Sequence, residues 1–206
     1  MLKYDNFILI LSAPSGTGKS TLVGKLMEQH PNFRYSISAT TRAPRKGEQD
    51  GVQYYFITRD EFEEKITKGE FLEYAEVHGN YYGTPKYDIE NHLSDNHDVI
   101  LDIDYQGMKI ITKYFEPRKV LKIFVLPPSL KELDRRLRKR NTDSEDVIQK
   151  RLSDAKGQIA HCEDYEYVLI DHNLEETFER IKSIILAKQV QNRVPDELDK
   201  FINDFR

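Results

Sequence analysis

Four short apolar runs are spaced along the chain, and each has the length of a buried strand. They cover residues 7–11, 99–103, 120–126 and 167–170. Continuous apolar runs of this length are typical of parallel strands that are covered on both faces. The segments between them carry apolar residues at helical spacing, so strands and helices alternate. This alternation predicts an α/β fold with a doubly wound parallel sheet.

Two long stretches interrupt the alternation, and we expect them to be insertions into the core. The first covers residues 35–92 and contains alternating patterns at 52–57 and 71–77, which predict strands. Between these strands, Thr58 and Glu61 form a capping box that opens a short helix. The first insertion is therefore predicted to be mostly β-structure, with Phe62 and Ile66 of its helix facing inward.

The second insertion, residues 127–161, is predicted to be helical. Two capping boxes mark the starts of two helices, namely Ser129 with Glu132 and Thr142 with Glu145. One stripe of the first helix is apolar and expected to be buried, and it consists of Leu130, Leu133 and Leu137. The basic side chains in this region are Arg135, Arg136, Arg138, Lys139, Arg140, Lys150 and Arg151. A solvated charged face is the alternative interpretation of this basic cluster.

The chain ends with one more amphipathic pattern and a terminal segment. Leu174, Phe178, Ile181 and Ile185 have helical spacing, and apolar residues after Pro195 continue in helical phase. The sequence indicates no function for the terminal segment beyond packing or subunit contact.

The chemistry concentrates in residues 12–21, directly between the first strand and the first helix. Gly16 and Gly18 allow backbone angles that side chains forbid, so that successive amides can point at phosphate oxygens. The start of the following helix adds its positive dipole end, and Lys19 adds an ammonium group for the β- and γ-phosphates. Ser20 would offer its hydroxyl to Mg²⁺.

One position departs from the usual phosphate-loop pattern, because Ala13 stands where that pattern begins with glycine. A methyl group restricts the turn slightly but removes no amide donor. The alternative is an ordinary glycine-rich turn with an incidental Gly-Lys-Ser sequence. The strand before the loop and the amphipathic helix after it favour a nucleoside triphosphate site.

Asp102 and Asp104 lie at the end of the second apolar run, on one face of the predicted strand. At the carboxyl end of a central parallel strand, such acids lie beside the phosphate loop and can hold Mg²⁺ through water. The alternative for either residue is an aspartate that caps the next helix.

Arg42 and Arg45 flank Pro44 in a turn of the first insertion. Guanidinium groups bind phosphate through two parallel hydrogen bonds, so this turn suits a second substrate that carries phosphate. Residues 80–84 add tyrosine and threonine hydroxyl groups without charge. The alternative is a solvated basic loop beside a tyrosine-rich strand.

The composition limits the class of protein and its partners. The chain has 206 residues, of which 38% are hydrophobic and 32% charged, as in a globular protein rather than a disordered or membrane one. Its net charge of −4 gives no reason to expect nucleic-acid binding. With Cys162 as the only cysteine, no internal disulfide can form, and we expect a cytoplasmic protein. The run 7–11 is too short to span a bilayer, so we expect no membrane partner.

Four segments together resemble the guanylate kinase family, and the similarity extends over nearly the whole chain. They are residues 12–20, 36–48, 79–83 and 101–107, and the family commonly shows alanine at position 13. The resemblance implies a P-loop NTPase-type core, a mostly β GMP-binding subdomain and a helical lid over ATP. The core would comprise residues 1–34, 93–126 and 162–206, the subdomain residues 35–92 and the lid residues 127–161.

The resemblance also implies a set of site residues. ATP would be bound by Ala13, Pro14, Ser15, Gly16, Thr17, Gly18, Lys19, Ser20 and Thr21, beside the Mg²⁺ ligands Ser20 and Asp102. The GMP phosphate would be held by Arg42, Arg45, Tyr54 and Tyr82, and guanine would be read by Ser38, Glu73, Thr84 and Asp104. The catalytic cations would be Lys19, Arg42, Arg136, Arg140 and Arg151. The family usually has serine at position 84 and often has asparagine at position 171, where this chain has Thr84 and Asp171.

The chemistry of guanine favours carboxylates for base recognition. Guanine presents N1–H and N2–H₂ side by side, and one carboxylate accepts from both, as Glu73 or Asp104 could. Adenine has an acceptor at N1 and would leave an oxygen unpaired. Unpaired buried polar groups are costly enough to supply roughly 10⁴-fold discrimination.

The expected reaction is phosphoryl transfer from MgATP to GMP, and we expect dGMP to serve as well. One alternative is a guanylate-kinase-like module that recognises a phosphorylated partner, but Lys19, Ser20 and the arginines argue against it. Another is a different nucleoside monophosphate or sugar phosphate kinase, which Glu73 and the turn at 40–45 argue against. The sequence leaves open whether the chain is a monomer or a homo-oligomer.

Overall fold

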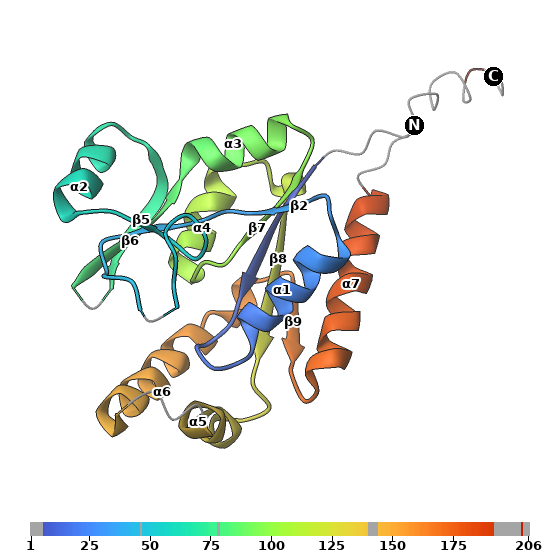
Figure 1. Cartoon of the computed structure of the whole chain (residues 1–206). Helices are drawn as coiled ribbons and strands as arrows, with labels where there is room; N and C mark the ends of the chain where they lie inside the picture. The colour runs from blue at the N-terminus through green and yellow to red at the C-terminus, as the bar shows by residue number, and fades with distance from the viewer. Residues whose placement is uncertain (1–5, 46, 78, 140–143, 192–202, 204–206) are drawn as a thin grey trace.

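The computed structural model describes residues 6–45, 47–77, 79–139, 144–191 and 203. Its core is a sheet of five strands in the order β2-β7-β1-β8-β9 (Figure 1). The strands are β1 (Ile8–Ser12), β2 (Phe33–Tyr35), β7 (Asp98–Leu101), β8 (Val120–Leu126) and β9 (Tyr167–Ile170). All neighbouring pairs run parallel. The predicted α/β fold class is confirmed.

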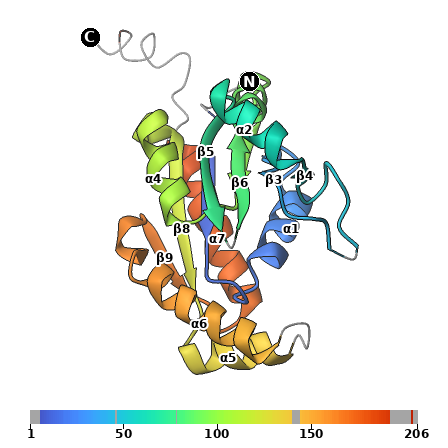
Figure 2. The ribbon, with the colours of Figure 1, turned by 90° about the vertical axis from the view of Figure 1, so that its left-hand side faces the viewer.

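Strand β1 lies at the centre of the sheet, and its side chains alternate between two apolar cores. Leu9 and Leu11 face one core, whereas Ile8 and Ile10 face the other. Successive side chains of a strand point to opposite faces, so both faces need a cover. The covering helices are α1 (Lys19–Gln29) and α7 (Leu174–Gln191) on one face, and α3 (Lys86–Ser94) and α4 (Tyr105–Tyr114) on the other. The core is therefore a three-layer structure (Figures 1 and 2).

The second apolar run forms a shorter strand than the sequence predicts. Strand β7 begins at Asp98, whose buried carboxylate accepts a hydrogen bond from the Phe7 amide at 3.1 Å. It ends at Leu101, so Asp102 and Asp104 lie in the following loop and not on one face of a strand. The end of β7 still delivers both carboxylates to the carboxyl edge of the sheet.

Both edge strands differ from the sequence interpretation. Strand β2 was not predicted, because it is only three residues long and has Arg34 at its centre. Strand β9 has the predicted bounds but is not buried, since Tyr167, Val168 and Ile170 are 40–46% exposed. An edge strand lacks a neighbour on one side, and its apolar composition alone could not reveal this.

The first insertion contains a separate small sheet in the order β4-β3-β6-β5. Its strands are β3 (Ala39–Thr40), β4 (Tyr55–Phe56), β5 (Phe71–Val77) and β6 (Asn80–Pro85), and helix α2 (Arg59–Thr67) covers it. The predicted capping box is present, because Thr58 and Glu61 bond each other's backbone amides. Phe62 of α2 is fully buried and stacks on Phe71 with ring centroids 4.3 Å apart. Of the strand predicted at 52–57, only the two residues of β4 are in a strand.

The second insertion forms the predicted pair of helices, α5 (Leu130–Lys139) and α6 (Glu145–Ile159). Leu133 and Leu137 are buried against Ile148, whereas Leu130 is 39% exposed and lies outside the buried stripe. Ser144 occupies the N-cap position of helix α6, but its side chain makes no capping hydrogen bond, and Thr142 lies outside the described residues. Figure 2 shows α5 and α6 at the opposite end of the molecule from α2.

Short 3₁₀ helices, η1 (Pro117–Lys119) and η2 (Cys162–Asp164), precede β8 and β9. Phe178, Ile181 and Ile185 of α7 are buried as predicted, whereas the segment after Pro195 lies outside the described residues, Asn203 excepted. Within the described part of the chain, no helix combines the length and apolar character needed to cross a bilayer.

Candidate active site

The loop between β1 and α1 has the backbone of a phosphate cradle. Gly16 and Gly18 have φ angles of 99° and 94°, in the left-handed region that favours glycine. Thr17 closes the turn by donating its hydroxyl to the Pro14 carbonyl at 2.7 Å. Helix α1 begins after Gly18 with no acidic residue in its first turn, so its positive end remains free to attract an anion. Ser15, Ser20 and Thr21 are exposed, and Ala13 is buried.

Lys19 forms an ion pair with Asp102 from the loop after β7. Their side chains are 21% and 23% exposed, so both remain accessible to a ligand. They line a cavity of about 80 Å³ together with Asp104. Ser12, at the end of β1, donates to the Ile103 carbonyl at 2.6 Å and fixes this loop against the phosphate loop. No pattern in the sequence predicted the Ser12 contact.

Asp104 caps helix α4, which is the alternative that the sequence left open. Its Oδ1 accepts hydrogen bonds from the amides of Gln106 and Gly107, each at 2.9 Å. Asp102 has the different role of partner to Lys19.

The small sheet supplies a wall of arginine and tyrosine side chains. The Arg42 guanidinium lies 5.4 Å from the ring centroid of Tyr54, whose ring lies 5.9 Å from that of Tyr82. Glu48 orders the arginine turn, because it pairs with Arg42 at 3.0 Å and accepts from the Arg45 amide at 2.7 Å. Burial opposes ionisation of Glu48, but the hydrogen bonds from Arg45 and Arg42 hold its pKa below the usual value. Sequence analysis did not assign Glu48 a role, although an acidic residue six positions after Arg42 could have indicated a partner for the arginine.

Glu73 and Thr84 meet across strands β5 and β6, where they are register partners. The buried Thr84 hydroxyl donates to Glu73 Oε1. Burial raises the pKa of Glu73, and the neighbouring charge of Asp104 raises it further. Ser38 lies before β3, where its carbonyl accepts from the Tyr55 amide at 2.9 Å. Glu73 is therefore joined to Thr84 by a hydrogen bond and lies within electrostatic range of Asp104, whereas no side-chain hydrogen bond joins Ser38 to these described residues.

Arg136 of α5 is held against the core by Asp171, which follows β9. Its Nη1 lies 2.6 Å from Asp171 Oδ2, and its Nη2 donates to the Asp171 carbonyl at 3.1 Å. Asp171 is 1% exposed, and its other oxygen accepts from Thr177 at 2.9 Å. Glu132 also pairs with Arg136, so its carboxylate does not complete the predicted capping box with Ser129.

Two further cavities adjoin the phosphate loop. The first, about 460 Å³, lies between the loop and α5, and it is lined by Gly16, Thr17, Gly18, Arg135, Arg136, Lys139, Asp171 and Leu174. The second, about 360 Å³, is where the loop, the small sheet and α6 meet, and its lining includes Ser15, Arg42, Arg45, Tyr54, Tyr82 and Arg151. Arg151 donates to Ser15 Oγ at 3.2 Å, and Arg140 lies outside the described residues.

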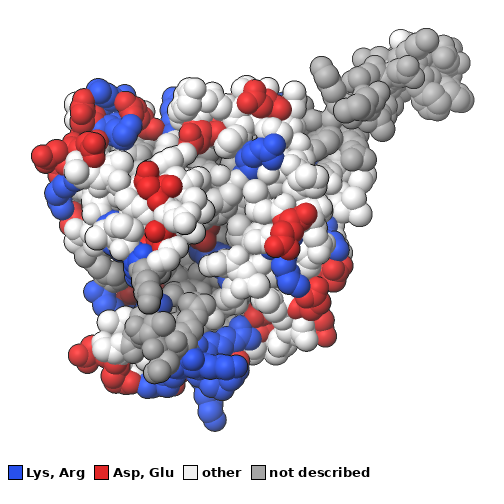
Figure 3. All heavy atoms as spheres, in the orientation of Figure 1, with Lys and Arg blue, Asp and Glu red and all other residues white. Residues whose placement is uncertain are grey.

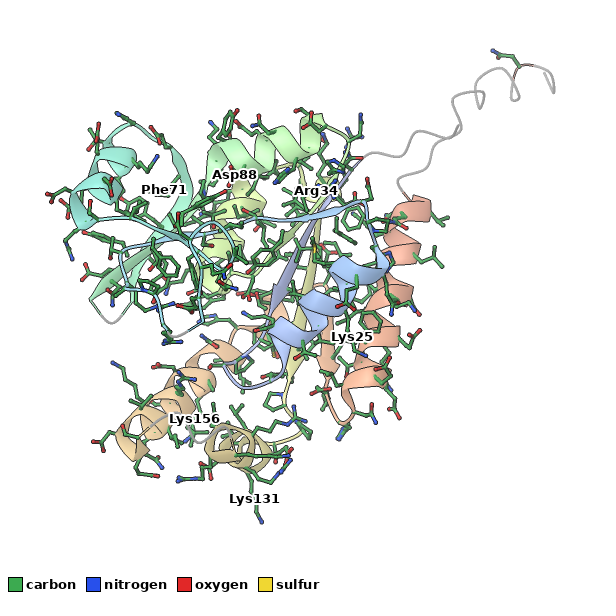
Figure 4. All side chains as sticks on the ribbon, viewed as in Figure 1. Lys25, Arg34, Phe71, Asp88, Lys131 and Lys156 are labelled. Atoms are coloured by element: carbon green, nitrogen blue, oxygen red, sulfur yellow. The ribbon has the colours of Figure 1, made fainter. Side chains whose placement is uncertain are left out.

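Basic side chains gather over α5 at the lower end of the face in Figure 3. Not all of them can serve the site, because Lys131 points away from the core in Figure 4. Within the predicted basic cluster, the solvated-face interpretation is correct for Arg138, which is 43% exposed and pairs with Asp134 and Glu145. Arg136 and Arg151 instead point toward the phosphate loop.

A phosphate loop at the carboxyl edge of a parallel sheet, between an arginine-lined insertion and a basic helical insertion, defines a P-loop kinase of small phosphorylated acceptors. A sequence model of the family described as "Guanylate kinase" matches residues 6–188. The guanylate kinase of Cereibacter sphaeroides is 51% identical over 193 residues, which cover 93% of this chain and 92% of that protein. The guanylate kinase of Rickettsia felis is 46% identical over 188 residues, which cover 91% of this chain and 97% of that protein.

A solved structure supports the same relationship. The crystal structure of guanylate kinase from Anaplasma phagocytophilum has a TM-score of 0.78 and 37% identity, covering 98% of this chain and 96% of that one. The chain belongs to the guanylate kinase family. The family resemblance and the kinase activity toward GMP that were predicted from the sequence are thereby confirmed. The site residues and the boundaries of the three parts stay predictions.

The pair between Arg136 and Asp171 yields a stability prediction. We expect Asp171→Ala to lower the free energy of unfolding by about 3 kcal/mol, because it removes the buried carboxylate that pairs with Arg136 Nη1 and accepts from the Thr177 hydroxyl, and leaves Glu132 as the remaining carboxylate partner of Arg136. Urea denaturation measures this loss. The control is Asp164→Ala, which removes an exposed pair with Lys109 and should cost less than about 1 kcal/mol. Equal losses in the two variants would contradict the buried-pair interpretation.

Proposed function

We propose that this enzyme transfers the γ-phosphoryl group of ATP to the phosphate of GMP, giving ADP and GDP, within the cavity where its three parts meet. The supporting observation is that Ser15, Arg42 and Arg151 line one cavity of about 360 Å³ although they come from three separate elements. Two nucleotides placed end to end need cations from both sides, and this cavity provides them.

ATP is proposed to bind with its phosphates on residues 13–21 and its nucleoside toward the cavity of about 460 Å³ beside α5. The left-handed glycines aim backbone amides at the phosphates, and Lys19 adds its ammonium group. Arg136, Arg140 and Arg151 would neutralise charge on the transferring group from the lid, residues 127–161. The present pairing of Arg136 with Asp171 means that only part of its guanidinium remains for a ligand.

The residues around Lys19 fit a magnesium ion delivered with ATP. Mg²⁺ keeps several waters and is bound by one or two protein oxygens plus phosphates, rather than by a protein cage. In accord with this mode, no group of three or more metal-binding side chains occurs among the described residues. The exposed Ser20 hydroxyl and the Asp102 carboxylate would hold the ion. When bound, Mg²⁺ neutralises charge on the β- and γ-phosphates.

Lys19 and Asp102 would separate when the triphosphate binds. The phosphates offer Lys19 a stronger anion than one carboxylate does, because they carry more charge and more acceptor oxygens. Asp102 would then be free to hold the magnesium ion through water. An exchange of partners of this kind leaves neither charge unpaired in the free enzyme or in the complex.

GMP is proposed to bind to the first insertion, residues 35–92. Arg42, Arg45, Tyr54 and Tyr82 would hold its phosphate through guanidinium and phenol donors. Glu73, with Ser38, Thr84 and Asp104, would read the guanine edge, and we propose that dGMP is accepted as well. The acceptor phosphate oxygen is already nucleophilic at neutral pH, so no covalent intermediate is required and catalysis rests on in-line positioning.

An acceptor panel tests this proposal directly. In a coupled assay with ATP, we expect GMP to exceed AMP, CMP, UMP and TMP in kcat/KM by about 10⁴-fold or more, because only guanine satisfies the buried carboxylate. Activity with dGMP is expected as well, and ATP alone supplies the hydrolysis control. Preference for another acceptor would overturn the base-reading assignment, and tight GMP binding without turnover would favour a binding module.

The raised pKa of Glu73 predicts a pH-dependent difference between wild type and Glu73→Gln. Only the ionised carboxylate accepts from both guanine donors, so the affinity advantage of wild type for GMP should be largest near neutral pH. It should shrink as the pH falls through this pKa, above the usual range for glutamate. Calorimetry at several pH values gives the ratio of the GMP Kd of Glu73→Gln to that of wild type. Titration of the GMP phosphate affects both Kd values equally and cancels in this ratio. A ratio that does not change with pH would contradict this role.

Lys19→Met should reduce kcat by about 10²–10³-fold, because it removes a cation that faces the developing charge. The Kd of GMP should remain within about threefold, since Lys19 is assigned to the donor phosphates. Lys25→Met is the matched control from the same helix, where Lys25 pairs with Glu175 on the surface. Steady-state kinetics and calorimetry measure both variants, and retained turnover in Lys19→Met would refute the assignment.

A further inference from the structure

Gly107 lies where two acidic side chains meet the first turn of α4. It is the third residue of this helix, it is buried, and its amide donates to Asp104 Oδ1 at 2.9 Å. Glu73 approaches from strand β5 on the other side. A Cβ built on Gly107 would lie 3.2 Å from both Cδ and Oε2 of Glu73. Side-chain atoms rarely come this close, so any larger residue at this position would displace the Glu73 carboxylate.

The Glu73 carboxylate has little room to yield. Its Oε1 accepts from the Thr84 hydroxyl, whereas its Oε2 is the oxygen nearest to Gly107. Strands β5 and β6 hold Glu73 and Thr84 as register partners, so a shift away from α4 would strain or break this hydrogen bond. The added Cβ would also lie 3.3 Å from Ile103 Cβ, so helix α4 cannot easily move back either.

The position of the Glu73 carboxylate beside the N-terminal end of α4 also favours its negative charge. Burial and the charge of Asp104 both disfavour the ionised carboxylate. The N-terminal end of a helix has the opposite effect, because its dipole and amides stabilise negative charge within the first turn. Close approach to α4 therefore helps Glu73 to remain an acceptor for two donors.

We propose that Gly107 is a positioning residue for guanine recognition, because the missing side chain lets the Glu73 carboxylate lie against the first turn of α4. This inference rests on the proposed function of Glu73. Gly107 itself is assigned no contact with GMP, and its effect is exerted entirely through Glu73.

The test is a double-mutant cycle on GMP binding and turnover. Gly107→Ala should raise the Kd and the KM of GMP by about tenfold, since small displacements of recognition groups carry large penalties. The KM of MgATP and kcat should change by less than about twofold, as for a lost ground-state contact. In the Glu73→Ala background, the same Gly107→Ala change should raise the Kd of GMP by less than about twofold. Gly24→Ala is the control, because its Cβ meets no atom within 4 Å and should change none of these values.

The outcomes separate this inference from the proposed function. If Glu73→Ala leaves the Kd of GMP unchanged, the base-reading role of Glu73 fails, and this inference fails with it. If Glu73→Ala weakens binding but Gly107→Ala has no effect, or the same effect in both backgrounds, only this inference is overturned. Should Gly107→Ala lower the melting temperature, it should do so by less in the Glu73→Ala background, because the Glu73 part of the conflict is then absent and only the contact with Ile103 remains. An equal loss of melting temperature in both backgrounds would also overturn the inference.

Discussion

The cations of the site are held by carboxylates of the protein before any substrate is present. Lys19 pairs with Asp102, Arg42 with Glu48, and Arg136 with Asp171. Two unit charges 4 Å apart interact by about 4 kcal/mol at an effective dielectric constant of 20, so an isolated cation cluster would destabilise the empty enzyme. Pairing removes this repulsion and fixes each side chain near its place of use. Under the proposed function, a phosphate group would then replace one anion with a stronger one instead of entering a disordered cluster.

The sheet topology brings these pairs together. Strands β1 and β7 are parallel neighbours, so their carboxyl ends deliver the phosphate loop and Asp102 to the same edge. The helical insertion is tied to that edge by packing as well as charge, since a Cβ on Gly16 would lie 2.8 Å from Leu137 Cδ2. Helix α5 therefore cannot move far without changing its contact with the phosphate loop. This contact links the position of the proposed lid to the loop that would hold the donor phosphates.

Local patterns in the sequence predicted the elements that depend on neighbouring residues. The strand at 120–126, the capping box of Thr58 with Glu61, and the glycines of the phosphate loop all have short-range causes. The features that were missed depend on residues far apart in the chain. Strand β2 is stabilised by pairing with β7, the buried Asp98 by the Phe7 amide, and Arg136 by Asp171 from another element. No single-sequence pattern records such partners, so the residue types of the site were predictable while most of their contacts were not.

Asp104 shows how a helix cap and the base recognition proposed above can share one carboxylate. Its cap uses Oδ1 for both helix amides. A carboxylate has two oxygens and about four acceptor positions, so the cap leaves Oδ2 available for a donor on a ligand. The cap also fixes the side-chain torsions, which lowers the entropy lost when a base donor binds. Serving as a helix cap therefore does not compete with the proposed base recognition. The cap would hold the carboxylate in place for a base donor, on the same helix turn where Gly107 leaves space for Glu73.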